Sequence, residues 1–276
     1  MKVALCRSKK LRLDGAAATM ANEAFRSTIP TCTLGGMQIA SLSGEETANL
    51  IIDVARGRRE DVEAPLYMTS SDAAAVSSYA LSPMVREIYD DADVVSPESG
   101  IMVRFSHLLS RTPLAGPCDT TGLFHDVARR APEGFRFFLF GATAVEVQRA
   151  ADVTRQMYPH IEIAGCSHGF LDTSEERALL RRLDALQPDV LWLGLSVPKQ
   201  RQFVLRNREK LGSVKVIRTC GTLISDLAAT GQAAPDWLSR AGLAGLHSLW
   251  REPRRIARRL LVANPHSAYL MLAHSR

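Results

Sequence analysis

A lysine and a glutamine follow an apolar run in the segment Leu193–Gln200, whose sequence is Leu-Gly-Leu-Ser-Val-Pro-Lys-Gln. The run predicts a buried strand, and the proline fixes the turn after it. Lys199 suits a diphosphate, and Gln200 suits sugar hydroxyls or a nucleobase edge. The same pattern also describes a helix N-terminus with ordinary surface residues. The residues alone leave both interpretations open.

A second candidate lies near the C-terminus, where the run from Arg251 to Leu261 predicts a basic amphipathic helix. Between residues 247 and 276, six arginines stand against one acid, Glu252. Such a helix suits anionic lipid or phosphate, while a solvated terminal helix and a nucleic-acid helix would use the same side chains. The candidate phosphate contacts are Arg254, Arg255 and Arg258.

These groups need elements to hold them, and the second half of the chain predicts strands that alternate with helices. Compact apolar runs, some closed by glycine, predict buried parallel strands. We expect strands at 135–140, 161–164, 189–195 and 214–217, with helices at 144–158, 174–186 and from the Pro198 turn to Lys210. In the first half we expect a helix capped by Ser43, a strand at 65–71, a helix at 83–89 and a strand at 93–96.

This alternation predicts an α/β fold, with a Rossmann-like parallel sheet flanked by helices on both faces. In such sheets, ligands bind beyond the carboxyl ends of the strands. Gly141 permits a sharp turn just before a helix, where backbone N–H groups can hold a phosphate, although many structural turns share this pattern. The rim formed by these strand ends is expected to contain Thr69, Glu98, Gly141, Gly165, Lys199, Gln200 and Gly221.

Composition narrows the class of protein. The chain has 276 residues, of which 46% are hydrophobic and 23% charged, so a large core is expected rather than disorder. The net charge of +5 suits anionic partners. Five scattered cysteines without a CxxC pair predict a reducing compartment and no zinc cluster. There is no GxGxxG fingerprint and no Walker loop, and the few aromatic residues are not interleaved with basic ones, which disfavours nucleic acid.

Three regions are expected along the chain. Residues 1–30 predict a poorly ordered tail, 31–230 an α/β core and 231–276 a helical basic appendage. No apolar run approaches the roughly 18 residues of a membrane span, so any membrane role is expected to be peripheral.

Five segments together resemble the WecG/TagA/CpsF glycosyltransferases, also called glycosyltransferase family 26. The order and spacing of the segments agree with that family from about residue 33 to about residue 265. They are Phe137–Gly141, Tyr158–Gly165, Pro188–Gln200, Ala234–Trp237 and Gly242–Arg255. The resemblance implies an inverting transfer, with no required metal or other cofactor, from a UDP-sugar donor to a polyprenyl-diphosphate-linked saccharide acceptor. Family members add N-acetylmannosamine, its uronic acid or glucose during the assembly of surface polysaccharide.

The resemblance also implies roles for particular groups. A base takes a proton from the acceptor hydroxyl, and positive groups offset the charge on the departing diphosphate. Gln200 matches the loop glutamine of the family and would hold the donor. The C-terminal arginines would bind the diphosphate and dock the enzyme on an anionic membrane surface. The implied location is the cytoplasm, peripheral on the inner face of the plasma membrane, and a homo-oligomer is left open.

The first half departs from the family pattern at functional positions. The Thr-Pro-Asn-like segment of the family is Thr69-Ser70-Ser71, with the threonine kept. The aspartate that precedes a glycine in the family falls on Ser99, and Glu98 stands one residue earlier. A serine is not an effective base at neutral pH, whereas Glu98 offers the required carboxylate.

Later departures follow the same trend. A second family aspartate falls on Ser225, beside Asp226; Ala233 replaces an arginine; and Arg201 replaces a glutamate.

The predicted catalytic residues are Glu98 and Thr69. The predicted substrate-binding residues are Ser71, Ser99, Gly141, Gly165, Gly194, Lys199, Gln200, Gly221, Asp226, Arg254, Arg255 and Arg258. Two hypotheses follow: an active enzyme with Glu98 as its base, which we favour, or an inactive member that binds a nucleotide-sugar or a partner glycosyltransferase at the membrane.

Overall fold

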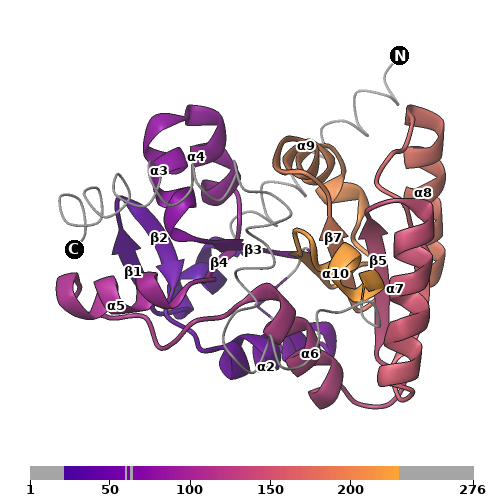
Figure 1. Cartoon of the computed structure of the whole chain (residues 1–276), viewed down its shortest axis with the longest axis horizontal. Helices are drawn as coiled ribbons and strands as arrows, with labels where there is room; N and C mark the ends of the chain where they lie inside the picture. The colour runs from indigo at the N-terminus through magenta and orange to yellow at the C-terminus, as the bar shows by residue number, and fades with distance from the viewer. Residues whose placement is uncertain (1–21, 60, 63–64, 230–276) are drawn as a thin grey trace, which may run out of the picture.

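The computed structural model describes residues 22–59, 61–62 and 65–229. Its centre is a sheet of six strands in which every neighbouring pair is parallel (Figure 1). In spatial order the strands are β4 (Val94–Pro97), β3 (Leu66–Ser71), β8 (Val216–Thr219), β7 (Val190–Gly194), β5 (Arg136–Gly141) and β6 (Glu162–Ser167). A separate antiparallel hairpin joins β1 (Thr31–Leu34) to β2 (Met37–Ala40).

Helices cover both faces of this sheet, as the alternating pattern predicted. On one face lie α2 (Gly44–Ala55), α6 (Thr120–Arg130), α7 (Ala144–Met157) and α10 (Leu223–Ala229), and α2 and α6 run side by side (Figure 1). The hairpin packs on the other face with α3 (Ala73–Leu81), α4 (Pro83–Asp90), α5 (Gly100–Leu109), α8 (Thr173–Leu186) and α9 (Val197–Asn207). A short 3-10 turn, η1 (Arg208–Lys210), follows α9.

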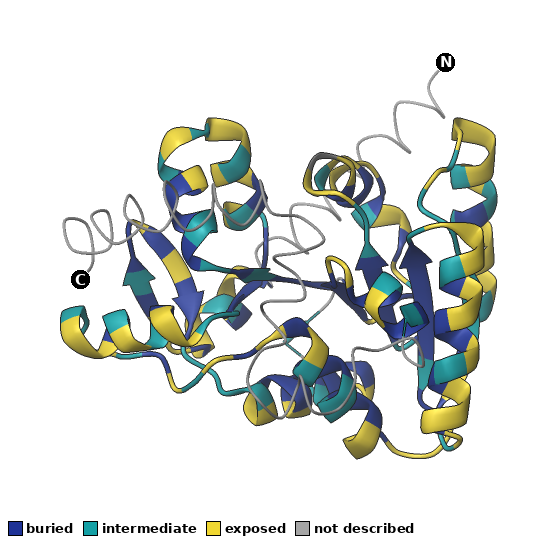
Figure 2. Ribbon diagram, viewed as in Figure 1, coloured by how far each residue is buried: buried dark blue, intermediate teal, exposed yellow. Residues whose placement is uncertain are grey.

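The strands β5 and β7 are almost wholly apolar because both of their faces are buried. In β5, Phe137 and Leu139 belong to the core under α2, α6 and α7, whereas Phe138 and Phe140 belong to the core under α8 and α9. Figure 2 shows the central strands as buried and the outer helix faces as exposed. This continuous apolar pattern is typical of a parallel sheet covered on two sides.

Two helices begin with reciprocal capping boxes. The Ser43 hydroxyl accepts a bond from the Glu46 N–H, and the Glu46 carboxylate accepts one from the Ser43 N–H, which confirms the predicted start of α2. Thr143 and Glu146 form the same motif at the start of α7. The second box fixes the helix that follows the glycine turn at Gly141.

The predicted disordered tail is too long. Residues 22–28 are helical, and Phe25 is 0% exposed within the core that contains α2. Arg26 bonds the Asp93 carboxylate and the Asp90 and Asp91 carbonyls, which ties this segment to the start of β4. Residues 22–30 therefore belong to the folded body, while residues 1–21 and the predicted appendage lie outside the described residues.

Candidate functional site

The carboxyl ends of the parallel strands meet at one edge, and polar side chains gather there. The Thr69 hydroxyl of β3 lies 2.9 Å from the Thr219 hydroxyl of β8. The Glu98 N–H, just after β4, donates to the Ser71 carbonyl at 2.8 Å. Three neighbouring strand ends are thus joined at the predicted rim.

The chain leaves these strands in opposite directions. β5 continues into α7 on one face, while its neighbour β7 continues into α9 on the other. Likewise, β8 continues into α10 and its neighbour β3 into α3, on opposite faces. Ligands of open α/β sheets bind where such connections diverge, so the strand ends of β3, β8, β7 and β5 form the candidate site.

Two glycines allow the ends of β5 and β7 to meet closely. A Cβ atom on Gly141, which has φ of +150°, would lie 2.2 Å from the Gly194 carbonyl oxygen. A Cβ atom on Gly194 would lie 2.9 Å from the Ile224 side chain of α10. Gly141 and Gly194, both predicted to bind substrate, are therefore needed for the close packing of these two strand ends.

Glu98 is half-buried, and its carboxylate is held in place. Its Oε1 accepts a hydrogen bond of 3.0 Å from the Thr120 hydroxyl at the start of α6. The Ser70 hydroxyl lies 3.3 Å from the same Thr120 oxygen. Next to Glu98, Ser99 is the N-cap of α5, but its buried hydroxyl makes no cap bond and has no partner among the described residues.

Lys199 is exposed on the opposite flank of the rim. Its Nζ lies 5.2 Å from the centre of the Phe170 ring, and Phe170 is 66% exposed. The Gly169 N–H donates to the Ala142 carbonyl at 2.9 Å, which places the loop after β6 against the loop after β5. An ammonium group and an aromatic face thus stand together beside the glycine turn.

Gln200 points inward, in contrast to Lys199. It is 5% exposed and lies beside Tyr67 of β3. Burial raises the pKa of the Tyr67 hydroxyl, and the nearby Gln200 side chain opposes that rise, although the hydroxyl has no partner of normal hydrogen-bond geometry among the described residues. Arg201 pairs with Glu87 and, at 3.8 Å, with Asp91.

The last part of the rim is the turn after β8. Gly221 has φ of +50°, a conformation that glycine adopts without strain. The Thr222 hydroxyl donates to the exposed Asp226 carboxylate at 2.9 Å, in the first turn of α10. Asp226 is therefore oriented by the residue that precedes its own helix.

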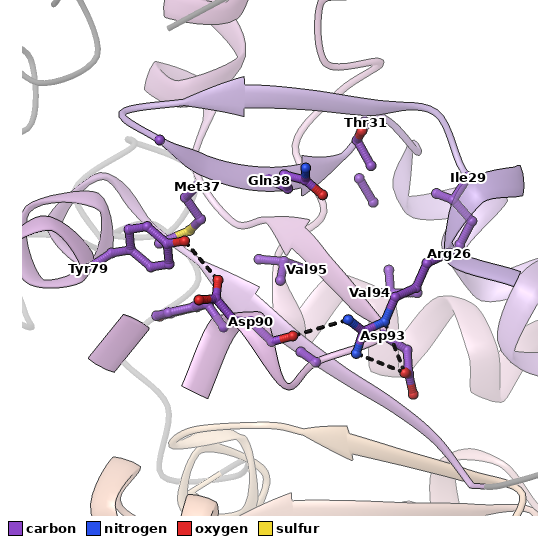
Figure 3. Close-up of a pocket in the computed structure, with 14 residues that line it drawn as sticks. Arg26, Ile29, Thr31, Met37, Gln38, Tyr79, Asp90, Asp93, Val94 and Val95 are labelled. Atoms are coloured by element: carbon purple, nitrogen blue, oxygen red, sulfur yellow. Dashed lines mark hydrogen bonds and ion pairs between the residues drawn. The ribbon is translucent and has the colours of Figure 1, made fainter. Parts of the chain in front are cut away.

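A separate cavity of about 320 Å³ lies away from this rim (Figure 3). It is lined by the β1–β2 hairpin, by Arg26 and Ile29 just before it, by Tyr79, and by residues 89–90 and 92–95 around the start of β4. Asp93 stands at the amino end of β4, whereas Glu98 follows its carboxyl end. Three charged groups in its wall are already engaged, because Arg26 pairs with Asp93 and Asp90 accepts a hydrogen bond from Tyr79.

Comparison with known proteins decides the family. The family model described as "Glycosyl transferase WecG/TagA/CpsF family" matches residues 32–276, which is most of the chain.

This chain belongs to the WecG/TagA/CpsF glycosyltransferase family.

Relatives in Staphylococcus aureus agree with this assignment. One, from strain MW2, is named N-acetylglucosaminyldiphosphoundecaprenol N-acetyl-beta-D-mannosaminyltransferase and is 23% identical over 194 residues, covering 70% of this chain and 75% of the relative. A protein of the same name from strain NCTC 8325 / PS 47 is 24% identical over 185 residues, covering 64% and 71% respectively.

Within this family member, some predicted site residues lie elsewhere than expected. Gly165 was predicted in a loop but lies inside β6, where an added Cβ would be 2.7 Å from the Phe138 ring. The Ser71 side chain is fully buried at the end of β3, with its hydroxyl 3.4 Å from the Asp72 carbonyl. Arg254, Arg255 and Arg258 lie outside the described residues.

Sequence reasoning missed three residues that this glycosyltransferase places at the rim. Thr120 and Thr219 are brought to Glu98 and Thr69 by folding alone, since each pair is far apart in the sequence. A usable signal existed for Phe170, an aromatic residue just beyond a glycine in a strand-end loop.

Across residues 22–59, 61–62 and 65–229, no group of three or more His, Cys, Asp or Glu side chains is placed to hold a metal ion. In those same ranges, no helix has the length and apolar character that a bilayer crossing requires.

Proposed function

We propose that this family member is an inverting transferase that moves a hexose from a UDP-sugar to a lipid-linked saccharide during surface polysaccharide assembly. The observation that carries the proposal is the Glu98 carboxylate, half-buried at the carboxyl rim and held by Thr120 at 3.0 Å. A carboxylate fixed at the ligand-binding edge of the sheet is suited to act as a general base.

The names of the relatives supply the first substrates to test. They specify an N-acetylmannosaminyl group and an N-acetylglucosaminyl diphosphoundecaprenol acceptor. We therefore propose a polyprenyl-diphosphate-linked saccharide as acceptor and N-acetylmannosamine as the first donor sugar, ahead of its uronic acid and glucose. No metal or other cofactor takes part in the proposed reaction.

The proposed mechanism divides the rim between two tasks. Glu98 takes the proton of the acceptor hydroxyl, whose oxygen then attacks the anomeric carbon on the face opposite the diphosphate. The bond from that carbon to the diphosphate breaks, and UDP leaves with the electron pair. Lys199, which is exposed on the other flank, offsets the charge on the leaving diphosphate. The Thr69–Thr219 pair holds β3 and β8 together beneath these groups.

A binding experiment tests the substrate class. Calorimetry with UDP and a panel of UDP-hexoses, using the purified full chain, is expected to give micromolar binding with a preference for one sugar. Absence of binding to every member of the panel, with and without a short-chain lipid diphosphate acceptor, favours the second hypothesis. In that case the protein binds a partner glycosyltransferase at the membrane and does not transfer sugar, in keeping with Ser99 and Ser225 at the family's acidic positions.

Replacing the proposed base tests the mechanism. Glu98→Gln keeps the shape of the side chain and its bond from Thr120 but cannot accept the proton. We expect turnover to fall by at least ~100-fold while donor binding changes little. Glu133→Gln, at an exposed glutamate before β5, is the matched control and should leave turnover unchanged. Near-normal turnover in the Glu98 variant would remove this carboxylate from the mechanism.

A further inference from the structure

One arginine is fully buried and has no hydrogen-bond partner among the described residues. Arg218 is the penultimate residue of β8, near the middle of the sheet, and its side chain is 0% exposed. Its Nε, Nη1 and Nη2 atoms make no hydrogen bond to any described residue. A buried guanidinium is costly unless it is paired, and it has no uncharged state in practice, so this group needs an anion in some state of the protein.

Arg218 lies close to the rim of the proposed active site. In the sheet, Arg218 stands between Met68 of β3 and Trp192 of β7, one residue before β8 ends. The groups whose charges would act on it include Glu98 and the thiols of Cys118 and Cys220, which lie at or beyond the carboxyl strand ends. The guanidinium therefore lies beside the carboxyl ends of β4 and β8.

The thiols and the phenol near Arg218 cannot neutralise it. Burial raises the pKa of the Cys220 thiol to about 12 and also raises the pKa values of Cys118 and Tyr67. These three groups are therefore uncharged near neutral pH. Glu98 is the carboxylate that acts on Arg218, but its hydrogen bond goes to Thr120 instead.

Other unused donors lie at the same strand ends. The hydroxyls of Ser96, in β4, and Ser99, the N-cap of α5, are both buried and have no partner of normal hydrogen-bond geometry among the described residues, although Ser96 lies beside the Cys118 thiol. The ten-residue helix α5 also begins without a side-chain cap, which leaves its first N–H groups without that acceptor. A guanidinium fork, two hydroxyls and a helix N-terminus together form the chemistry that binds a phosphate group.

We propose that Arg218 is the cation of a phosphate subsite between the ends of β4 and β8, closed in the ligand-free protein and occupied by a diphosphate during the reaction. This inference deepens the proposed function and rests on it. The diphosphate enters from the rim past Glu98 and Ser99, because β3, β7 and the α2–α6 layer enclose the other sides of Arg218. Two ligands carry this group: the nucleotide donor and the lipid acceptor.

The test measures binding of inorganic pyrophosphate by thermal shift, with the full chain and the variants Arg218→Met and Arg218→Lys. Pyrophosphate should stabilise the wild type, because a ligand that binds the folded state raises Tm. Arg218→Met should weaken this binding by at least ~10-fold, and Arg218→Lys by less, since lysine keeps the charge but not the fork. Without pyrophosphate, the methionine variant should melt at or above the wild-type Tm, because it removes an unpaired buried charge. Arg206→Met, at an exposed arginine of α9, is the control.

Three results would overturn the subsite. The first is pyrophosphate binding in Arg218→Met that is as strong as in the wild type. The second is a large loss of basal Tm in Arg218→Met that Glu98→Gln reproduces, which would make the two residues a structural ion pair. Failure of Arg218→Met to fold is the third, since the proposal requires the neutral variant to be stable.

Two further comparisons show which ligand carries the diphosphate and distinguish a failure of the subsite from a failure of the proposed function. If Arg218→Met weakens UDP binding but not binding of a short-chain polyprenyl diphosphate, the subsite serves the donor; the reverse assigns it to the acceptor. Arg218-dependent binding of pyrophosphate without any sugar transfer would defeat the proposed function and leave the subsite standing. Sugar transfer together with pyrophosphate binding that does not depend on Arg218 would defeat the subsite and leave the proposed function standing.

Discussion

At the scale of residues, Glu98 depends on a partner that no motif predicts. The sequence predicts a role for this carboxylate, because the family pattern has an acid in the same loop. Thr120, which holds that carboxylate, is 22 positions away and comes into contact with it only because α6 begins under the end of β4. Arg218 likewise could not be predicted as a site residue, because an arginine near the end of a strand indicates a site only once the structure shows that it is buried.

The glycine turn at the rim gives a prediction at this scale. Gly141→Ala should destabilise the protein by at least about 2 kcal/mol, because the added methyl group would lie 2.2 Å from the Gly194 carbonyl oxygen. Gly212→Ala is the control, since nothing lies within 4 Å of its added methyl group, and it should change stability by less than about 0.5 kcal/mol. Urea denaturation measures both. Equal midpoints for the two variants would show that the strand ends separate without cost.

At the scale of elements, buried strands were easy to predict and their boundaries were not. The apolar runs at 135–140 and 189–195 correspond to β5 and β7 because both faces of these strands are buried. Gly165 was misplaced because a glycine inside a strand resembles one that ends it; here the strand continues over the Phe138 ring. The helix at residues 22–28 was not predicted, because so short a helix is stabilised by long-range contacts that a sequence does not show, such as that of Arg26 with Asp93.

Asp93 joins three elements and gives the prediction for this scale. Its side chain is 0% exposed, receives a bond from Arg26 at 3.2 Å and pairs with Arg208 of η1. Asp93→Asn should cost about 3–5 kcal/mol, because it leaves two partly buried guanidinium groups without their charge partner. Asp152→Asn, which breaks an exposed pair with Arg155, should cost at most about 1 kcal/mol. Similar unfolding midpoints for both variants would contradict a central role for Asp93.

At the scale of the whole molecule, the order of the strands was beyond sequence reasoning. Periodicity predicts that β7 and β8 exist, but not that they lie between β5 and β3. Because the segments that meet at the rim come from residues 69 to 226, the pattern of loops could be predicted while the contacts among them could not. Only the spatial order shows that Glu98 and Lys199 stand on opposite flanks.

The charge distribution gives the prediction for this scale. The sequence from His247 to Arg276 carries six arginines and one acid, which we propose contact lipid or donor phosphate. Changing both Arg254 and Arg255 to alanine should weaken binding to anionic vesicles or to UDP. Sedimentation with vesicles and calorimetry with UDP measure the two cases, and Arg177→Ala with Arg181→Ala, on α8, serves as the control pair. Unchanged binding in both assays would defeat this role.

The position of β8 has a consequence for biosynthesis. It is the last strand described along the chain, yet it lies near the middle of the sheet, between β3 and β7. While the ribosome is still making residues 1–215, the β3–β4 pair and the β5–β7 strands have no hydrogen bonds to each other through the sheet. A nascent chain that stalls there exposes two unsatisfied strand edges, the kind of surface that chaperones cover and that aggregates by edge-to-edge pairing.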